Sequence, residues 1–317
     1  MTPKERAIAA FELREPDDIV PTFELQFQLS EALLGKKHAT QRELDEASPG
    51  EKDRLLSIEA ELYVEEAERL DYSIISVSFG PHNSEDLLQT IRRICRLVGE
   101  KYLIAVLLDG TMGIPNGQTM MTLSMRLTDD ADGLKAEQDR NVDGAIEYAK
   151  RLADAGVGVA LMVADYCFND GPFLSPAMFR EFVTPYLARQ VSELKKLGLY
   201  TVKHTDGNIM PILDQLVESG ADALHSIDPQ AGVDLKEVKR LVGDRIALCG
   251  NVRCDFLQSR TVQDAVTDAE RSLRDGMPGG GYFFCTSNTP FIGMPLENYL
   301  AALDVRRRLG WYKREGL

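Results

Sequence analysis

One short segment contains two residue types that bind metal ions, at a spacing that brings them together. In KHTDGN (203–208), His204 and Asp206 lie two residues apart, so in an extended chain their side chains point to the same side. An imidazole nitrogen and a carboxylate oxygen suit zinc, and a thiolate from Cys285 or Cys249 would complete three protein ligands with a fourth position open. In the alternative interpretation, His204 hydrogen-bonds within a polar layer and Asp206 forms an Asx turn.

Other polar residues follow short apolar runs and are candidates for catalysis or substrate binding. Because histidine titrates near neutral pH, His225 could orient substrate or move a proton; in the alternative it forms a loop-stabilising pair with Asp228. For Glu24 the alternative is a carboxylate paired with a basic residue. The predicted catalytic residues are Glu24, Asp165 and His225, and the predicted substrate-binding residues are Ser78, His82, Asp109, Tyr166, Asn251 and Asn288.

Eight apolar runs, typical of buried parallel strands, would position these residues. They span Ile19–Glu24, Tyr72–Val77, Tyr102–Leu108, Val157–Val163, Leu199–His204, Ala223–Ser226, Ile246–Cys249 and Tyr282–Cys285. Amphipathic helical patterns lie between most of them, at Pro176–Leu197, Ile209–Ser219, Leu235–Val242, Val262–Asp275 and Leu296–Leu309. This alternation predicts an α/β chain that forms a single (β/α)8 TIM barrel domain over residues 1–317, whose reactive groups lie at the carboxyl ends of the strands.

One part of the chain is longer than a strand–helix unit requires. We expect Asp109–Ala155 to form an insertion over the barrel mouth that ends in a helix over Arg140–Ala155. The glycine-rich stretch before the last run, Pro278–Gly281, lies on the opposite side of the predicted barrel. We therefore interpret it as a tight turn and not as a phosphate-binding loop.

Composition excludes several classes of protein. The 317 residues carry a formal net charge of -14 and a pI of about 4.9, so the phosphate backbone of a nucleic acid would be repelled. The five cysteines are widely spaced with no CxxC pair, which favours reduced thiols and a cytoplasmic location. No stretch approaches the roughly 18 apolar residues of a membrane span. The sequence therefore predicts a soluble cytoplasmic enzyme with a small-molecule substrate.

Several segments together resemble the uroporphyrinogen decarboxylase superfamily. They are PKERAIAAFELREPDDIVP, DGPFLSPAMFREFVTPY, KHTDGNIMPILDQLVESGADALHSIDPQAGVDLKEVKRLVGDRIALCGNV, and the PGGGYFFCTSNT and PLENY motifs near the end. The resemblance covers most of the chain and implies the same (β/α)8 barrel. It also implies one of two chemistries: decarboxylation of porphyrinogen acetate groups without a cofactor, or methyl transfer that involves a corrinoid protein, often with zinc.

Departures from the decarboxylase pattern favour methyl transfer. Decarboxylases of the family carry an arginine-rich RQAGRY-like segment near the start, which suits a substrate with many carboxylates. Here PTFELQFQLSEALLG (21–35) contains Glu24 and no arginine, and VSFGPH (77–82) replaces the family's aspartate after the second strand. A polyanionic porphyrinogen in a mouth lined by aspartates would meet repulsion on the order of several kcal/mol.

The metal-binding motif differs from that of the thiol-methylating relatives. These carry His-x-Cys and a later cysteine as zinc ligands, whereas here the pair is His204-x-Asp206, Asn288 falls near the later cysteine, and Cys285 lies three residues before it. Harder ligands suit activation of an ether or carboxylate oxygen better than a thiol. In this interpretation zinc is held by His204, Asp206 and Cys285, with Glu24 as a further candidate ligand.

The resemblance thus predicts a methyltransferase that moves a methyl group from a small methylated compound, such as an O-methyl aromatic, to the corrinoid of a separate partner protein. Uroporphyrinogen decarboxylation is the first alternative. A non-catalytic barrel that binds a tetrapyrrole or a corrinoid protein is the second. The resemblance also implies a homodimer.

Overall fold

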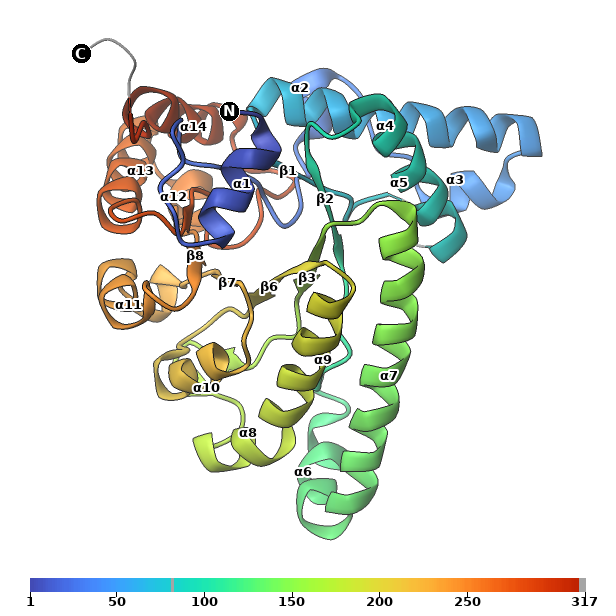
Figure 1. The fold of residues 1–317 in the computed structure, drawn as a ribbon, viewed down its shortest axis with the longest axis vertical. Coiled ribbons are helices and arrows are strands. Elements are labelled where there is room, and N and C mark those ends of the chain that lie inside the picture. The colour runs from blue at the N-terminus through green and yellow to red at the C-terminus, as the bar shows by residue number, and fades with distance from the viewer. Residues whose placement is uncertain (81–82, 314–317) are drawn as a thin grey trace.

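A parallel β-sheet forms the centre of the structure, a computed structural model that describes residues 1–80 and 83–313 (Figure 1). Within these residues the sheet has seven strands, in the order β1 (Ile74–Ser76), β2 (Leu103–Leu107), β3 (Val159–Met162), β6 (Tyr200–His204), β7 (Ala223–His225), β8 (Ala247–Cys249) and β9 (Tyr282–Phe283). Each strand pairs in parallel with its neighbours. All seven lie within apolar runs that the sequence predicts as strands.

The first predicted strand, Ile19–Glu24, is wrong as a strand of this sheet. Its residues nevertheless contact both edges: the backbone N–H of Ser73, just before β1, donates to the carbonyl oxygen of Thr22 at 2.7 Å, and that of Phe284, just after β9, donates to the carbonyl oxygen of Pro21 at 2.9 Å. Pro21 has no N–H to donate, which prevents regular pairing at this position. Because both edge strands reach one segment, the sheet is curled.

Apolar side chains fill both faces of the curled sheet. Alternate residues of a strand point to opposite faces, so Leu103 and Ala105 of β2 belong to an interior cluster while Ile104 belongs to an outer one. The interior cluster also contains Phe11 of α1 (Pro3–Phe11), whose ring stacks on Tyr200 with centroids 4.6 Å apart. Since Tyr200 begins β6, α1 covers the amino-terminal end of the sheet and leaves the carboxyl ends for a site.

Helices pack against the outer face of the sheet (Figure 1). The larger ones are α4 (Pro49–Leu70), α5 (Ser84–Val98), α7 (Ala131–Ala155), α9 (Thr184–Lys196), α11 (Leu235–Val242), α13 (Val262–Gly276) and α14 (Leu296–Leu309). Shorter helices connect these elements: α2 (Ser30–Leu34), α3 (Gln41–Glu46), α10 (Leu213–Glu218) and α12 (Cys254–Ser259). The predicted bounds of α11 and α14 are confirmed. The predicted helix Pro176–Leu197 is divided into α8 (Pro176–Phe182) and α9, because Pro185 lacks the N–H that a continuous helix requires.

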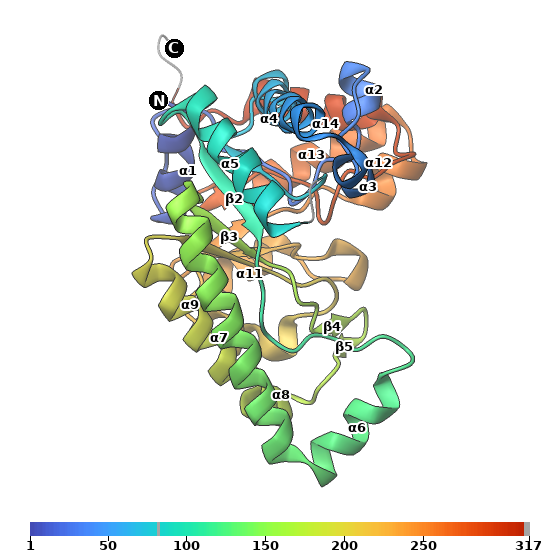
Figure 2. The ribbon, with the colours of Figure 1, turned by 90° about the vertical axis from the view of Figure 1, so that its right-hand side faces the viewer.

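An arm extends from the carboxyl end of β2. It consists of α6 (Met120–Asp129), which has no buried residue, and the first turns of α7. Figure 2 shows that the two helices meet at a tip that projects away from the sheet. An extra segment is thus present after β2, but it projects away from the sheet, and its long helix begins at Ala131 and not at Arg140. A two-stranded hairpin, β4 (Cys167–Phe168) and β5 (Gly171–Pro172), follows β3.

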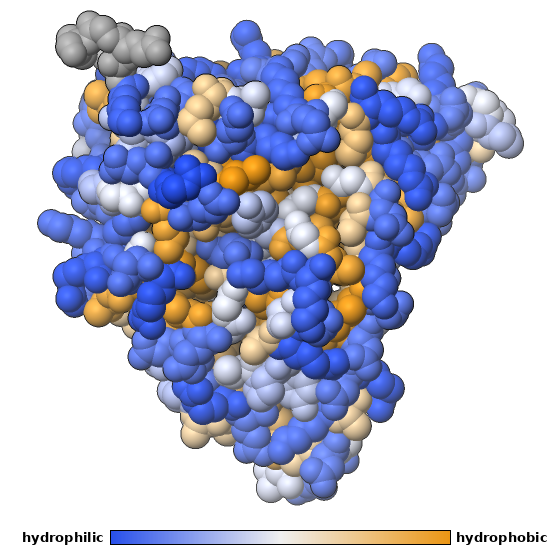
Figure 3. Space-filling model, in the orientation of Figure 1, coloured by the Kyte–Doolittle hydropathy of each residue, from blue (hydrophilic) through white to orange (hydrophobic). Residues whose placement is uncertain are grey.

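Hydrophilic residues cover most of the face seen in Figure 1, as expected for a chain of net charge -14, and apolar residues gather around a hollow in its middle (Figure 3). Across residues 1–80 and 83–313, no helix combines the length and the apolar character needed to cross a bilayer.

Candidate metal centre

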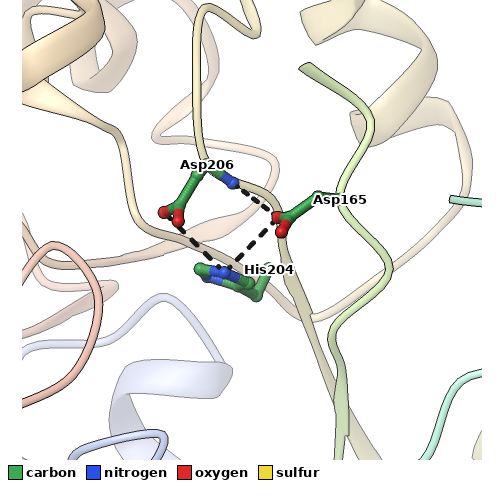
Figure 4. Close-up of side chains that lie close together, drawn as sticks. All are labelled: Asp165, His204 and Asp206. Atoms are coloured by element: carbon green, nitrogen blue, oxygen red, sulfur yellow. Dashed lines mark hydrogen bonds and ion pairs between the residues drawn. The ribbon is translucent and has the colours of Figure 1, made fainter. Parts of the chain in front are cut away.

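Three potential metal ligands meet at the carboxyl ends of β3 and β6 (Figure 4). His204 is the last residue of β6, Asp206 follows it, and Asp165 follows β3, which pairs with β6. The Nε2 atom of His204 lies 3.6 Å from Oδ1 of Asp165 and 3.8 Å from Oδ1 of Asp206. One ligand atom from each residue lies within 4.8 Å of the other two. The structure therefore brings His204 and Asp206 together and adds Asp165, which the sequence predicts as catalytic.

The loop after β6 is held by hydrogen bonds that fix Asp206. The backbone N–H of Asp206 donates to Oδ1 of Asp165 at 2.9 Å, and that of Gly207 donates to Oδ2 of Asp228 at 3.1 Å. Gly207 has a φ of +85°, and a Cβ there would lie 2.6 Å from the carbonyl oxygens of Cys167 and Phe168. Only glycine fits this turn without strain. Asp228 therefore holds the loop through Gly207, while His225 contacts His204.

The carboxylate of Asp206 accepts two hydrogen bonds from side chains. Ser226 Oγ donates to Oδ1 at 2.9 Å, and the amide of Asn288 donates to Oδ2. Burial raises the pKa of Asp206 to about 7, with the negative charges of Asp165 and Asp228 adding to the increase. A cation beside the carboxylate would reverse this effect. Asn288, predicted to bind substrate, thus contacts a candidate ligand.

A second histidine, His225, contacts His204. His204 and His225 face each other across β6 and β7, with their Nδ1 atoms 2.9 Å apart. Burial lowers the pKa of His204 to about 3 and lowers that of His225 well below its ordinary value. Both imidazoles are therefore neutral at neutral pH, and a neutral imidazole is the form that binds metal.

The cluster suits zinc by the chemistry of its ligands. It offers one imidazole nitrogen and two carboxylate oxygens, and three protein ligands with one open position form the usual arrangement of a catalytic zinc site. The Nδ1 atom of His204 is already engaged by His225, which leaves Nε2 toward the carboxylates. The position and charge of the three residues thus fit a divalent cation.

Cys285, the third ligand predicted from the sequence, lies outside the metal-ligand cluster of the described residues. The metal-ligand cluster in the described residues contains Asp165 in its place. Cys285 is 1% exposed and belongs to the interior apolar cluster, as does Cys249. Burial raises the pKa of both thiols well above the ordinary value.

Glu24 lies in a buried network of its own. Its carboxyl group is 2% exposed and accepts hydrogen bonds from the backbone N–H and the hydroxyl of Thr286, the latter at 2.6 Å, and from the hydroxyl of Tyr299 at 3.2 Å. Burial raises the pKa of Glu24 to about 8. Glu24 is not in the metal-ligand cluster, and its described hydrogen-bond partners are hydroxyl and amide groups in place of the basic residue of the alternative interpretation.

Two predicted substrate-binding residues, Asp109 and Tyr166, contact a buried lysine, Lys203, that is not among the predicted site residues. Lys203 is fully buried; its ammonium group donates to Oδ2 of Asp109 at 2.9 Å and lies 4.0 Å from the centroid of the Tyr166 ring. The hydroxyl of Tyr166 pairs with Thr111 at 2.5 Å. The sequence does hold one indication of the pair of Lys203 with Asp109, a lysine inside the apolar run YTVKH. A buried charge is rarely unpaired, so such a lysine predicts a buried partner.

The remaining predicted residues have separate partners. The side-chain amide of Asn251 donates to the carbonyl oxygen of Ile227 at 2.7 Å and its oxygen accepts from Arg271 at 2.9 Å, so both its polar atoms bind protein. The hydroxyl of Ser78 donates to the carbonyl oxygen of Leu25 at 2.7 Å. His82 lies outside the described residues.

Comparison with known proteins identifies relatives of this chain. A family model described as uroporphyrinogen decarboxylase (URO-D) matches residues 103–309. Methylcobamide:CoM methyltransferase MtaA of Methanosarcina barkeri is 26% identical over 271 residues, which cover 82% of this chain and 74% of that protein. Uroporphyrinogen decarboxylase of Anaeromyxobacter dehalogenans is 30% identical over 131 residues, or 41% of this chain and 36% of the enzyme. A methyltransferase structure from Methanosarcina mazei matches 97% of this chain and 99% of its own, with a TM-score of 0.75 at 21% identity, and so shares the fold.

Proposed function

Because the chain belongs to the uroporphyrinogen decarboxylase family, we propose from the chemistry of its site that it is a methyltransferase of that family. The substrate we propose is a small compound with a methyl group on oxygen, and the acceptor is the corrinoid of a separate partner protein. Similarity to a methylcobamide:CoM methyltransferase over 82% of the chain supports this choice over decarboxylation, because the similarity to the uroporphyrinogen decarboxylase of Anaeromyxobacter dehalogenans covers 41%.

The observation that carries the proposal is the cluster of one neutral imidazole and two carboxylates at the carboxyl end of the sheet. Parallel α/β sheets of this kind bind substrates at that end. The three side chains concentrate negative charge, which favours a divalent cation and repels a substrate that carries many carboxylates. No thiolate belongs to the cluster of the described residues, so its ligands are harder than those of a thiol-activating site.

In this proposal His204, Asp165 and Asp206 would hold zinc, and zinc when bound would supply Lewis acidity toward the oxygen of the substrate. The residues of the chain prepare that site. Asp206 is oriented by Ser226 and Asn288, and its backbone N–H holds Asp165. When the carbon–oxygen bond breaks, the oxygen would keep the bonding electron pair, and the methyl group would pass to the reduced corrinoid of the partner protein, whose cobalt would supply the electron pair of the new bond.

The first experiment measures zinc per chain in protein purified without chelator. We expect about one zinc in the wild type and its loss in His204→Ala, Asp206→Ala and Asp165→Ala. Cys285→Ser is the matched control, because a buried thiol outside the cluster should not affect the metal. Loss of zinc in Cys285→Ser with retention in Asp165→Ala would overturn the assignment of ligands.

The second experiment tests the reaction itself. Zinc-loaded protein is incubated with methoxylated aromatic compounds and reduced corrinoid proteins, and formation of the methylated corrinoid is followed by its absorption spectrum. We expect demethylation of at least one compound, abolished by His204→Ala. Release of carbon dioxide from a porphyrinogen by the metal-free protein alone would instead establish the decarboxylase function and refute the proposal.

A further inference from the structure

His225 has one nitrogen paired and one nitrogen without a partner. Its Nδ1 lies 2.9 Å from Nδ1 of His204, but its Nε2 is buried and has no hydrogen-bond partner among the described residues. The side chain is 1% exposed, and the neighbouring side chains include Phe23, whose ring centroid lies 6.3 Å away. A buried imidazole nitrogen without a partner is unusual and calls for an explanation.

Two neutral imidazoles that share one hydrogen bond have only two arrangements. In the first, Nδ1 of His204 carries the hydrogen and donates to His225, so that Nε2 of His204 presents a lone pair and Nε2 of His225 carries a hydrogen. In the second, Nδ1 of His225 carries the hydrogen and donates to His204. Nε2 of His204 then carries a hydrogen as well, and Nε2 of His225 carries none. The tautomers of the two rings are therefore linked.

The surroundings favour the second arrangement when no cation is present. Nε2 of His204 faces the carboxylates of Asp165 and Asp206 at 3.6 and 3.8 Å, and an N–H there is attracted to them while a lone pair is repelled. The unpartnered Nε2 of His225 points to the same conclusion, because a buried donor without an acceptor is rarer in proteins than an unused acceptor.

A metal ion reverses this preference, since it requires the lone pair of His204 Nε2. We propose that His225 is a positioning residue whose ring changes tautomer together with His204 when the metal binds. Binding then moves the hydrogen between the two Nδ1 atoms onto His204 and leaves His225 with a buried N–H on Nε2. This inference rests on the metal centre under Proposed function and adds a second residue to it.

Nitrogen NMR of the full chain labelled with 15N-histidine tests the linked change directly. The chain has four histidines, and His204→Ala and His225→Gln assign the pair. In zinc-free protein we expect a hydrogen on Nδ1 of His225 and on Nε2 of His204. Addition of zinc should move both, to Nε2 of His225 and to Nδ1 of His204. If zinc binds and His225 keeps its hydrogen on Nδ1, this inference is overturned while the metal centre stands. If zinc does not bind, the metal centre fails first.

Zinc affinity of two variants, measured by competition with a chelator of known affinity, gives a second readout. Phenylalanine keeps the ring but cannot accept the hydrogen bond from His204, so His225→Phe should weaken zinc binding by about tenfold to a hundredfold. His225→Gln should retain most of the affinity, because its amide can accept or donate. Equal affinities in wild type and both variants would refute a positioning role, and far-ultraviolet circular dichroism of zinc-free protein verifies that each variant is folded.

Discussion

Replacing Glu24 with glutamine should make the stability of the protein less sensitive to pH. Burial raises the pKa of Glu24 from an ordinary 4.5 to about 8, so the folded protein keeps a proton that the unfolded chain releases between these values. Below pH 4.5 the group is protonated in both states and its favourable burial is fully present. As the pH rises through about 8 that contribution is lost, and above it the loss levels off.

The size of this pH dependence follows from the single proton that Glu24 binds more tightly in the folded protein. Each pH unit in the interval from 4.5 to 8 changes the free energy of unfolding by about 1.4 kcal/mol. Between pH 5.5 and 7.5 the wild type should therefore lose roughly 3 kcal/mol relative to Glu24→Gln. Glutamine retains the contacts of the protonated acid, because its oxygen can accept from Thr286 and its amide can donate to Tyr299.

Urea denaturation followed by circular dichroism measures this difference at pH 5.5, 6.5 and 7.5. Glu270→Gln, at an exposed position of α13, is the matched control, and its difference from wild type should stay flat. A difference between wild type and Glu24→Gln that does not change with pH would refute the reasoning, because it would mean that the buried carboxyl group is ionised in the folded protein.

Three further changes test other parts of the structure. Lys203→Met should destabilise the fold by about 3–5 kcal/mol in urea denaturation, because Asp109 loses its buried partner; no recovery in the double variant with Asp109→Asn would contradict this. Burial opposes a charge on His38, but hydrogen bonds to two buried glutamates raise its pKa to about 9, so the stabilisation present below pH 6.5 should vanish as the pH rises through 9. Melting temperatures of wild type and His38→Gln should then converge between pH 6.5 and 9. A difference in melting temperature that stays constant over this interval would contradict the raised pKa of His38. Gly207→Ala should displace the loop of Asp206 and weaken zinc binding in calorimetry, whereas unchanged affinity would show that the loop tolerates the clash.

The strands of the sheet could be predicted well because parallel strands are buried on both faces. Each such strand is a continuous apolar run, and Val159–Met162 and Ala247–Cys249 lie inside the predicted runs. The run Ile19–Glu24 has the same composition but contains Pro21, and its contacts are made with segments that begin and end the sheet. Composition does not reveal which neighbours a segment will have.

The candidate site could be predicted in part. The spacing of His204 and Asp206 places them on one side of the chain, and Asp165 joins them because β3 and β6 are adjacent. The sequence places Cys285 at a strand end too, but does not indicate whether a side chain there points toward the loops or into the interior. The structure places it in the apolar cluster.

The environments of the buried ionisable residues could not be predicted, because they depend on distant parts of the chain. Glu24 is paired with Thr286 and Tyr299, more than 250 residues away: the separations are 262 and 275. Lys203 finds its carboxylate at Asp109, 94 residues earlier. Local patterns report the polarity of these residues but not their partners.

The contact between Thr22 and Phe284 has a consequence for the order of assembly. These residues are separated by 262 positions, and the hydroxyl of Thr22 donates to the carbonyl oxygen of Phe284. During synthesis on a ribosome, Thr22 is made 262 residues before Phe284, so this junction cannot form until Phe284 has been made. Contacts between residues so far apart in sequence form slowly and late. Until Phe284 has been made, the sheet has an edge that this junction later closes, and an uncovered sheet edge can pair with other chains.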